Sequence, residues 1–347
     1  MNIVDMHCDT ISALYEERKG GSDATLFHND LHVDIQKLKK SHYLLQNFAL
    51  FVKYDMEDPW ERTLKLLEIY KAELERNAEE LAPVLTYEDI RRNRENGKIS
   101  AMLTLEEGGV TRGDLKRLEW LYEQGVRMIT VSWNFENGLS HPNLSAVWGK
   151  VLRKEGAFPD EEARNAAFLR YLNTPEEKKG LTESGIEFVN RMEELGMIVD
   201  VSHMSDKGFY DVLNNTTKPF VASHSNARAV CPCVRNLTDD MIRKLADRGG
   251  VMGLNFCADF LTQVPYGTHN PGTIGSIVGH AKHILNVGGE DCLGLGSDFD
   301  GIDTHEELPG ADHMEKLWDA LDGSGFSERQ IEKIFTQNVL RVYKEVL

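Results

Sequence analysis

The sequence predicts an α/β fold of the (β/α)8 TIM-barrel class. Eight short apolar runs recur along the 347-residue chain, and longer helical patterns lie between most of them. A chain of this length holds two average domains or one large barrel, and the alternation of strands with helices favours the barrel. Polar side chains follow several of these runs, as expected where a barrel carries its active site. A doubly wound open sheet is the competing fold that the same pattern allows.

The expected strands are short runs rich in apolar and β-branched residues. Each run is too short to form a helix of ordinary length, which favours a buried strand. The eight runs are Ile3–Met6, Phe48–Val52, Ala101–Leu105, Met128–Val131, Ile198–Val201, Phe220–Ala222, Val251–Asn255 and Cys292–Gly296.

The expected helices are recognised by apolar residues three or four positions apart. One such stripe follows the second strand, another precedes the fourth, and a third ends at Gly196, a typical C-cap. Residues 274–287 and 331–347 are also helical in pattern. The three stripes consist of Leu64, Leu67, Tyr70, Leu74 and Leu81, then Leu115, Leu118, Leu121 and Tyr122, and finally Ile186, Val189, Met192 and Leu195.

Residues from about 134 to 181 interrupt this alternation with a mainly polar sequence. The segment follows the fourth strand, where barrel enzymes elaborate the rim of their active site. We therefore expect one barrel domain over residues 1–347, with a long rim excursion at about 134–181.

Composition restricts the partners and the compartment. The chain has 39 Lys and Arg against 56 Asp and Glu, so its net charge of −17 argues against nucleic acid or an anionic membrane. Five scattered cysteines do not form a disulfide framework and favour reduced thiols. No secretion signal stands at the N-terminus, and no run approaches the ~18 apolar residues of a membrane span. These features predict a cytoplasmic protein with no membrane partner.

Side chains of the types that bind metal ions follow five of the expected strands. In a barrel the carboxyl ends of all strands face one mouth, so these side chains would converge there. Imidazole and carboxylate ligands together suit Zn²⁺ and similar divalent ions. The candidates are His7 and Asp9 after the first strand, Glu106 and Glu107 after the third, His203 after the fifth, His224 after the sixth, and Asp298 and Asp300 after the eighth.

Several of these motifs together resemble one family. The segments "DMHCDT", "LEEGG", "VDVSHMS", "SHSNARAVCPCVRNLTDD" and "GLGSDFDG" are similar to those of the membrane (renal) dipeptidase family of the amidohydrolase superfamily. The resemblance runs from residue 3 to the end of the chain, and the motifs stand in family order. It implies a (β/α)8 barrel with two zinc ions bridged by a glutamate.

The resemblance also implies a ligand set. His7 and Asp9 would bind one metal ion, and His203 and His224 the other. An alignment without a gap places the bridging glutamate at Glu106, whereas a one-residue gap would choose the following residue, Glu107. We favour Glu106, because the next helix then also stays in register.

Further roles follow from the same resemblance. Asp298 falls on the catalytic acid/base of the family, and Arg235 on the arginine that holds the carboxylate of the substrate. Trp133 stands where many members carry a histidine that helps to bind substrate, so we expect it at the substrate site. Cys257 replaces a nearby family tyrosine. Both departures concern the substrate range and not the metal ligands.

The expected function is that of a zinc-dependent dipeptidase. It would hydrolyse short dipeptides, L-L and also L-D, by means of a hydroxide bridging two Zn²⁺ ions. A homodimer is expected, because dimers are common in the family. Two alternatives remain: a related metal-dependent amidohydrolase acting on N-acyl amino acids or lactams, and a barrel that binds metal or ligand without turnover. A membrane-anchored form is a third, but neither a signal nor an anchor is visible.

Overall fold

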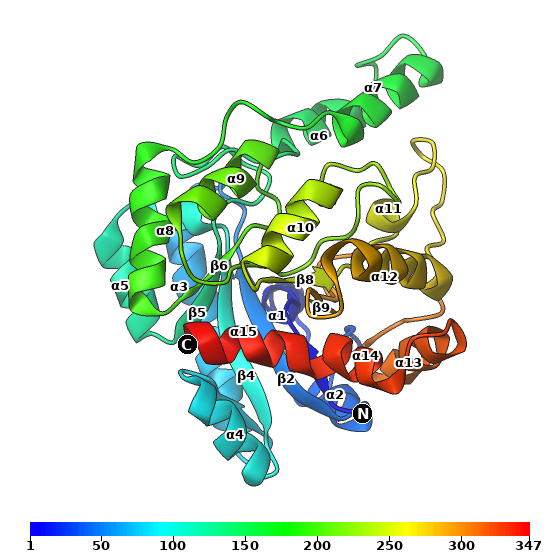
Figure 1. Cartoon of the computed structure of the whole chain (residues 1–347). Helices are drawn as coiled ribbons and strands as arrows, with labels where there is room; N and C mark the ends of the chain where they lie inside the picture. The colour runs from blue at the N-terminus through cyan, green and yellow to red at the C-terminus, as the bar shows by residue number, and fades with distance from the viewer.

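The computed structural model describes residues 1–347, and its centre is a closed ring of eight parallel strands surrounded by helices (Figure 1). The ring closes because β1 pairs with both β2 and β9, while β2 pairs with β4. This confirms the (β/α)8 prediction and excludes the open sheet. In order around the ring the strands are β1 (Ile3–Asp5), β2 (Tyr43–Phe51), β4 (Ile99–Glu106), β5 (Val126–Thr130), β6 (Ile198–Asp200), β7 (Val221–Ala222), β8 (Val251–Leu254) and β9 (Leu293–Leu295).

A ninth strand, β3 (Leu81–Pro83), pairs with the start of β4 outside the ring. The helical stripe expected to reach Leu81 was therefore wrong at its end, because the helix stops at Arg76. Leu81 instead pairs in parallel register with Ile99. Apolar spacing alone cannot show that a partner strand is available, and here strand pairing overrides the helical pattern.

The helices occupy the positions that the alternation predicted, with additional short ones. Gly196 ends the third predicted stripe at φ 74°, the left-handed conformation that glycine adopts most easily. The predicted helix over 331–347 is divided by a π-helical turn at Lys333–Gln337. The α-helices are α1 (Thr10–Lys19), α2 (Ile35–Lys40), α3 (Pro59–Arg76), α4 (Tyr87–Glu95), α5 (Leu115–Glu123), α6 (Ala146–Arg153), α7 (Glu161–Asn173), α8 (Glu183–Leu195), α9 (Asp206–Asn215), α10 (Asp239–Asp247), α11 (Ala258–Leu261), α12 (Ile274–Gly288), α13 (Met314–Gly323), α14 (Glu328–Glu332) and α15 (Asn338–Val346).

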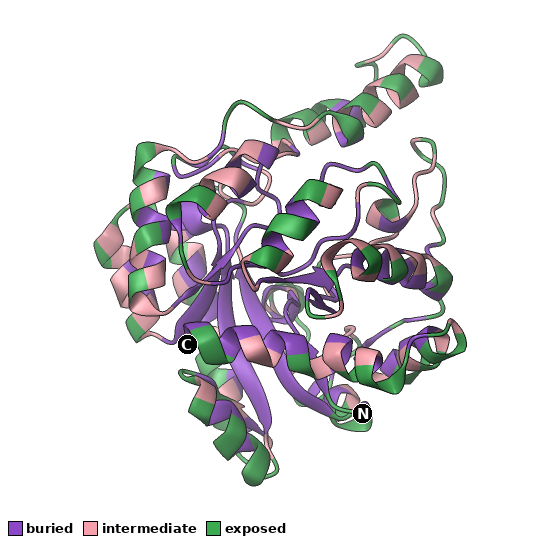
Figure 2. Cartoon of the chain, viewed as in Figure 1, coloured by how far each residue is buried: buried purple, intermediate pink, exposed green.

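Two apolar layers hold the barrel together, and its strands are almost entirely buried (Figure 2). The larger layer lies between the strands and the surrounding helices. The smaller one joins strand residues such as Val4 and Met6 to one face of α15, including Val342 and Tyr343. The hydroxyl of Tyr343 lies 2.7 Å from the amide nitrogen of Asn47 on β2. The C-terminal helix thus packs against the barrel strands, and the polar side chains gather at their carboxyl ends.

The segment between β5 and α8 contains α6 and α7, which project from the barrel (Figure 1). Lys150 on α6 pairs with Asp55 in the loop after β2. At the other end, Val234 donates its backbone N–H to the carbonyl of Leu172 at 2.7 Å. No helix of the structure has the length and apolar character needed to cross a bilayer.

Candidate metal centre

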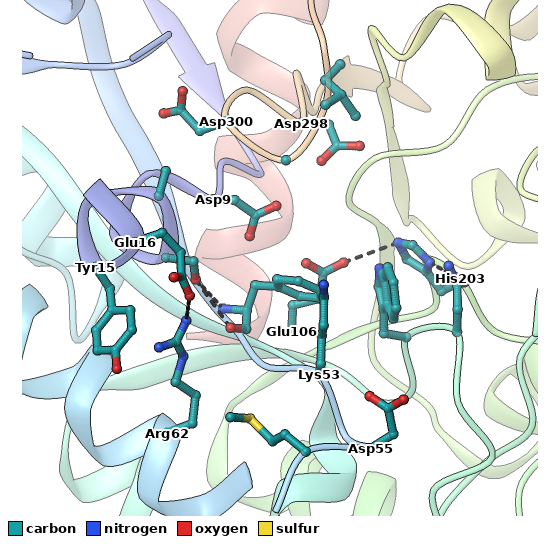
Figure 3. Close-up of a pocket in the computed structure, with 18 of the residues that line it drawn as sticks. Asp9, Tyr15, Glu16, Lys53, Asp55, Arg62, Glu106, His203, Asp298 and Asp300 are labelled. Atoms are coloured by element: carbon teal, nitrogen blue, oxygen red, sulfur yellow. Dashed lines mark hydrogen bonds and ion pairs between the residues drawn. The ribbon is translucent and has the colours of Figure 1, made fainter. Parts of the chain in front are cut away.

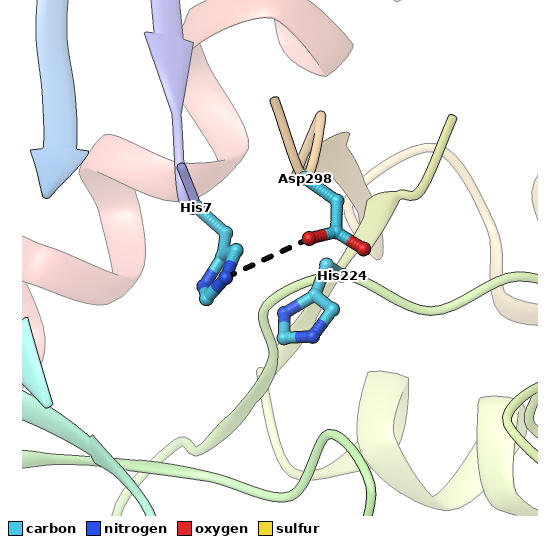
Figure 4. A group of neighbouring side chains, drawn as sticks. All are labelled: His7, His224 and Asp298. Atoms are coloured by element: carbon cyan, nitrogen blue, oxygen red, sulfur yellow. Dashed lines mark ion pairs between the residues drawn. The ribbon is translucent and has the colours of Figure 1, made fainter. Parts of the chain in front are cut away.

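Six of the predicted side chains meet at the carboxyl ends of the strands. Their possible ligand atoms form three overlapping groups, each within 4.8 Å. Glu106, the last residue of β4, belongs to two of these groups, as do His7 and His224. Figure 4 shows the group formed by His7, His224 and Asp298. The groups are His7, Asp9 and Glu106; Glu106, His203 and His224; and His7, His224 and Asp298.

The two carboxylate oxygens of Glu106 face different histidines. Oε2 lies 3.4 Å from Nε2 of His7. Oε1 lies 3.2 Å from Nε2 of His203 and 3.5 Å from Nε2 of His224. Glu106 therefore divides the cluster into one half on the β1 side and another on the β6 and β7 side.

The half on the β1 side is rich in carboxylates. Nε2 of His7 lies 3.6 Å from Oδ2 of Asp9 and 3.8 Å from Oδ1 of Asp298. Yet Nε2 of His7 and Oδ1 of Asp9 are buried and have no hydrogen-bond partner. Buried polar atoms rarely remain unpaired in native proteins, so these two favour a ligand between them.

The other half contains two imidazoles whose Nε2 atoms lie only 2.9 Å apart. Nδ1 of His203 lies 2.9 Å from the side-chain oxygen of Asn134, and Nδ1 of His224 lies 2.7 Å from the hydroxyl of Ser223. Where both Nδ1 atoms donate, both Nε2 atoms present lone pairs to each other. Such a pair is stabilised by a cation bound between or beside the two nitrogens, so the donor set fits divalent metal ions.

The pKa values of the histidines differ between the two halves of the cluster. Burial lowers the pKa of His203 and His224 well below the ordinary value and keeps both neutral, the form that binds metal. Burial opposes protonation of His7 too, but Glu106 and Asp9 outweigh it and raise its pKa. Burial also raises the pKa of Glu106 to about 7 and that of Asp298 to about 6. Bound cations would reverse the shifts of the carboxyl groups.

Glu107 points away from the cluster and anchors the loop after β5. Its carboxylate accepts hydrogen bonds from the backbone N–H groups of Gly109 at 2.8 Å and Trp133 at 3.1 Å, and from the side-chain amide of Asn137. Burial raises its pKa to about 7. A Cβ at Gly109 would approach the Asn137 Cβ to 2.4 Å, so this turn needs glycine. The structure thus places Glu106, and not Glu107, among the histidines.

Asp298 is held by a residue that the sequence patterns did not single out. Asn255, directly after β8, donates its amide to Oδ2 of Asp298 at 2.9 Å, and both side chains are buried. The backbone of Asp298 is left-handed at φ 63°, as are His203 at 70° and Glu107 at 106°. Left-handed non-glycine residues commonly gather at functional sites. The place of Asn255 after a strand was the available signal.

The cluster opens into a cavity of about 630 Å³ (Figure 3). Asp9, Glu106, His203 and Asp298 line its floor. Trp133 also lines it, and its ring packs 5.0 Å from Phe51 and 5.4 Å from Phe135 between centroids. Trp133, Phe51 and Phe135 thus form an aromatic cluster, of which Trp133 and Phe51 line the cavity.

The rim of the cavity carries charged side chains. Arg62 pairs with Glu16 at 2.5 Å, and its guanidinium carbon lies 3.5 Å above the ring of Tyr15. Lys53 lines the cavity, points into it in Figure 3 and makes no ion pair. Sequence reasoning missed Lys53, because nothing in the local pattern distinguishes it from a surface lysine.

Arg235 is close to the cluster but does not line the large cavity. It is 3% exposed, and it donates to the carbonyl of His224 at 3.1 Å and to the hydroxyl of Ser225 at 3.4 Å. Phe260, which does line the cavity, has its ring centroid 5.2 Å from the guanidinium carbon. Nε of Arg235 is buried without a partner.

Comparison with known proteins identifies relatives over nearly the whole chain. The family model described as membrane dipeptidase (peptidase family M19) matches residues 1–149 and 161–347. An uncharacterized Klebsiella pneumoniae protein from the pqqA 5′ region is 35% identical over 83% of this chain and 97% of its own length. An uncharacterized dipeptidase of Schizosaccharomyces pombe is 30% identical over 92% of this chain and 74% of its own.

Solved structures share the fold. The metallopeptidase named dipeptidase AC superposes with a TM-score of 0.84 at 24% identity, covering 100% of this chain and 98% of its own. A Rhodobacter sphaeroides metallopeptidase, liganded with a phosphinate mimic of the dipeptide L-Ala-D-Ala, gives 0.82 at 23% identity, covering 100% and 99%. These likenesses agree with the closed barrel described above.

Proposed function

Because the chain belongs to the membrane dipeptidase family of metallopeptidases, we propose that it is a zinc-dependent dipeptidase that hydrolyses L-L and L-D dipeptides. The main support for this proposal is the position of Glu106, whose two oxygens face separate histidine sites on the floor of the cavity. A carboxylate shared in this way suits a pair of divalent ions.

The residues present define two sites. His7 and Asp9 would hold one Zn²⁺ ion and His203 and His224 the other, with Glu106 between them. When bound, such ions lower the pKa of a water molecule toward neutrality and polarise the peptide carbonyl. The remaining tasks, positioning the substrate and moving protons, fall to side chains of this chain.

Asp298 would act as the general acid and base. Its Oδ2 accepts the amide of Asn255, which fixes the orientation of the carboxyl group and leaves Oδ1 toward His7. From the cavity floor it would take a proton from the attacking water and give it to the departing amine.

Arg235 would bind the terminal carboxylate of the dipeptide. Its buried Nε lacks a partner, and a guanidinium forms strong paired hydrogen bonds with a carboxylate. The ring of Phe260, which lines the cavity, lies 5.2 Å from the guanidinium carbon of Arg235. Trp133 would contact the substrate side chain across the cavity.

We further propose a cytoplasmic homodimer with a small dipeptide as its substrate. The five free cysteines, four of them buried, favour a reducing compartment. Light scattering of the purified chain measures the subunit number, and fractionation of cells tests the location.

The decisive experiment compares purified, metal-free and Zn²⁺-reloaded protein. Metal content is measured on each sample together with hydrolysis of L-L and L-D dipeptides, including L-Ala-D-Ala, N-acyl amino acids and lactams. We expect two Zn²⁺ per chain and dipeptide hydrolysis that disappears and returns with the metal. Hydrolysis by the metal-free protein would refute the proposal, turnover of acyl amino acids alone would favour the related amidohydrolase, and metal binding without turnover would indicate a binding protein.

A further inference from the structure

The tripeptide Ile-Val-Asp forms both β1 and β6, and each aspartate is tied to a serine after the neighbouring strand. Asp5 accepts the hydroxyl of Ser297 at 2.6 Å and its backbone N–H at 2.9 Å. Asp200 accepts the hydroxyl of Ser223 at 2.6 Å and its backbone N–H at 2.8 Å. All four residues are 0% exposed. The barrel therefore contains two nearly identical aspartate–serine pairs below the candidate metal centre.

The two pairs differ in what the serine touches next. The hydroxyl of Ser223 lies 2.7 Å from Nδ1 of His224. The hydroxyl of Ser297 contacts only backbone groups, the carbonyl of His7 and the N–H of Phe299, each at 3.2 Å. One pair thus reaches an imidazole ring and the other does not.

The hydrogen bonds of Ser223 determine which ring nitrogen of His224 carries the proton. A carboxylate can only accept, so the single O–H of Ser223 is directed at Asp200. The hydroxyl oxygen must then accept a proton from Nδ1 of His224, which leaves the lone pair on Nε2. Nε2 is the atom that faces Glu106 and His203.

We propose that Asp200 and Ser223 are positioning residues that hold His224 in the Nδ1–H tautomer, ready to bind a divalent ion through Nε2. The pair of Asp5 and Ser297 has the same chemistry but serves the fold. This inference rests on the proposed metal centre, in which Nε2 of His224 is a ligand.

An asparagine at position 200 offers a sharp test. Oδ1 of Asp200 accepts two backbone N–H groups, from Ser202 at 3.0 Å and Ser223 at 2.8 Å, so an amide must keep its oxygen there. Its NH₂ group then faces the hydroxyls of Ser223 and Thr130, both 2.6 Å from Oδ2. Ser223 would accept from this amide and turn its O–H toward His224. The Asp200→Asn change should therefore move the imidazole proton to Nε2.

The tautomer is measured by NMR of ¹⁵N-histidine-labelled, metal-free protein at mildly alkaline pH, where imidazole is neutral. Zn²⁺ affinity is measured by competition with a chromophoric chelator. We expect the Nδ1–H tautomer in the unaltered chain and the Nε2–H tautomer in Asp200→Asn. Ser223→Ala should weaken Zn²⁺ binding by about 10- to 100-fold, the usual effect of losing such a partner, and Asp200→Asn at least as much.

The matched control is Ser297→Ala, which removes an equally buried hydroxyl at the same distance from its aspartate. It should change Zn²⁺ affinity by less than about threefold, since no ligand ring loses a partner. The Nε2–H tautomer in the unaltered chain would overturn the proposal even if every variant failed to fold. Equal losses in Ser223→Ala and Ser297→Ala would also overturn it. Neither readout needs turnover, so a chain that binds Zn²⁺ as expected but cleaves no dipeptide would refute the proposed function alone.

Discussion

The floor and the rim of the cavity are built in opposite ways. On the floor the histidines and carboxylates of the cluster are at most 8% exposed, and hydrogen bonds at strand ends hold His203 and Asp298. On the rim, Lys53 and Asp55 are exposed, and Trp148 on the projecting α6 is 56% exposed. Buried, hydrogen-bonded side chains have one arrangement, whereas exposed ones have many. The floor is thus suited to precise chemistry and the rim to adjustable contacts with substrate.

Substitution of Glu106, the carboxylate shared by both histidine sites, should cause the largest loss of metal binding and activity. Glu106→Gln removes the charge that faces both histidine sites. We expect bound metal to fall and kcat/KM to drop by about 10³-fold or more, because each loss of about 1.4 kcal/mol in transition-state stabilisation is tenfold. Metal analysis and steady-state kinetics check this.

The matched control is Glu107→Gln at the adjacent position. It weakens contacts to backbone N–H groups and should lower the free energy of unfolding by about 1–3 kcal/mol while metal content is retained. If the two variants lost metal equally, the assignment of Glu106 to the floor would be wrong.

Asp298 separates proton transfer from metal binding on the same floor. Asp298→Asn keeps the shape of the side chain beside Asn255 but removes its basicity. We expect kcat to fall by about 10²- to 10⁴-fold with bound Zn²⁺ unchanged. A variant that keeps most of its kcat would show that another group moves the proton.

Substitution of Arg235 tests whether a buried cation close to the cluster, but not lining the cavity, binds substrate. Arg235→Ala should raise KM by about 10- to 100-fold with a smaller change in kcat, the effect of losing charge-assisted hydrogen bonds. Arg235→Lys keeps the charge without the paired geometry and should recover only part of the binding. An unchanged KM would assign the carboxylate of the dipeptide to a different residue.

Substitution of Lys53 tests whether an exposed cation on the rim of the cavity binds substrate. Because its ammonium is exposed and screened by solvent, Lys53→Ala should raise KM by no more than about fivefold, with greater effect at low salt. Lys19→Ala, at a cavity lysine that lies 3.9 Å from Glu16, is the control and should change KM less. A larger effect at Lys53 than at Arg235 would reverse the roles of rim and floor.

The outermost part of the rim should tolerate change. Trp148→Ser alters a side chain on the exposed face of α6. We expect the free energy of unfolding to change by no more than about 0.5 kcal/mol in chemical denaturation, with kcat/KM unaffected. A marked loss of activity would mean that α6 contacts the substrate.

Strand order and the chemistry at the strand ends could be anticipated from the sequence. The apolar run at Ile198–Val201 and the histidine that follows it are local features, and parallel strands present their carboxyl ends to one mouth whatever the loops do. The helical stripe ending at Leu81 misled, because pairing with Ile99 is a non-local interaction.

The choice between Glu106 and Glu107 separates what the sequence determined from what only the tertiary structure decided. Two consecutive glutamates at the end of a strand have the same side chain. By itself the sequence determined only that a carboxylate lies at this strand end. The tertiary structure decided which one faces the histidines: Glu107 turns to the loop after β5, and Glu106 remains in the strand. Likewise, the repeated Ile-Val-Asp is visible in the sequence, but only the fold brings Ser223 between Asp200 and His224. Spacing along the chain sets which residues share a strand end, whereas hydrogen bonds between distant segments set where each side chain points.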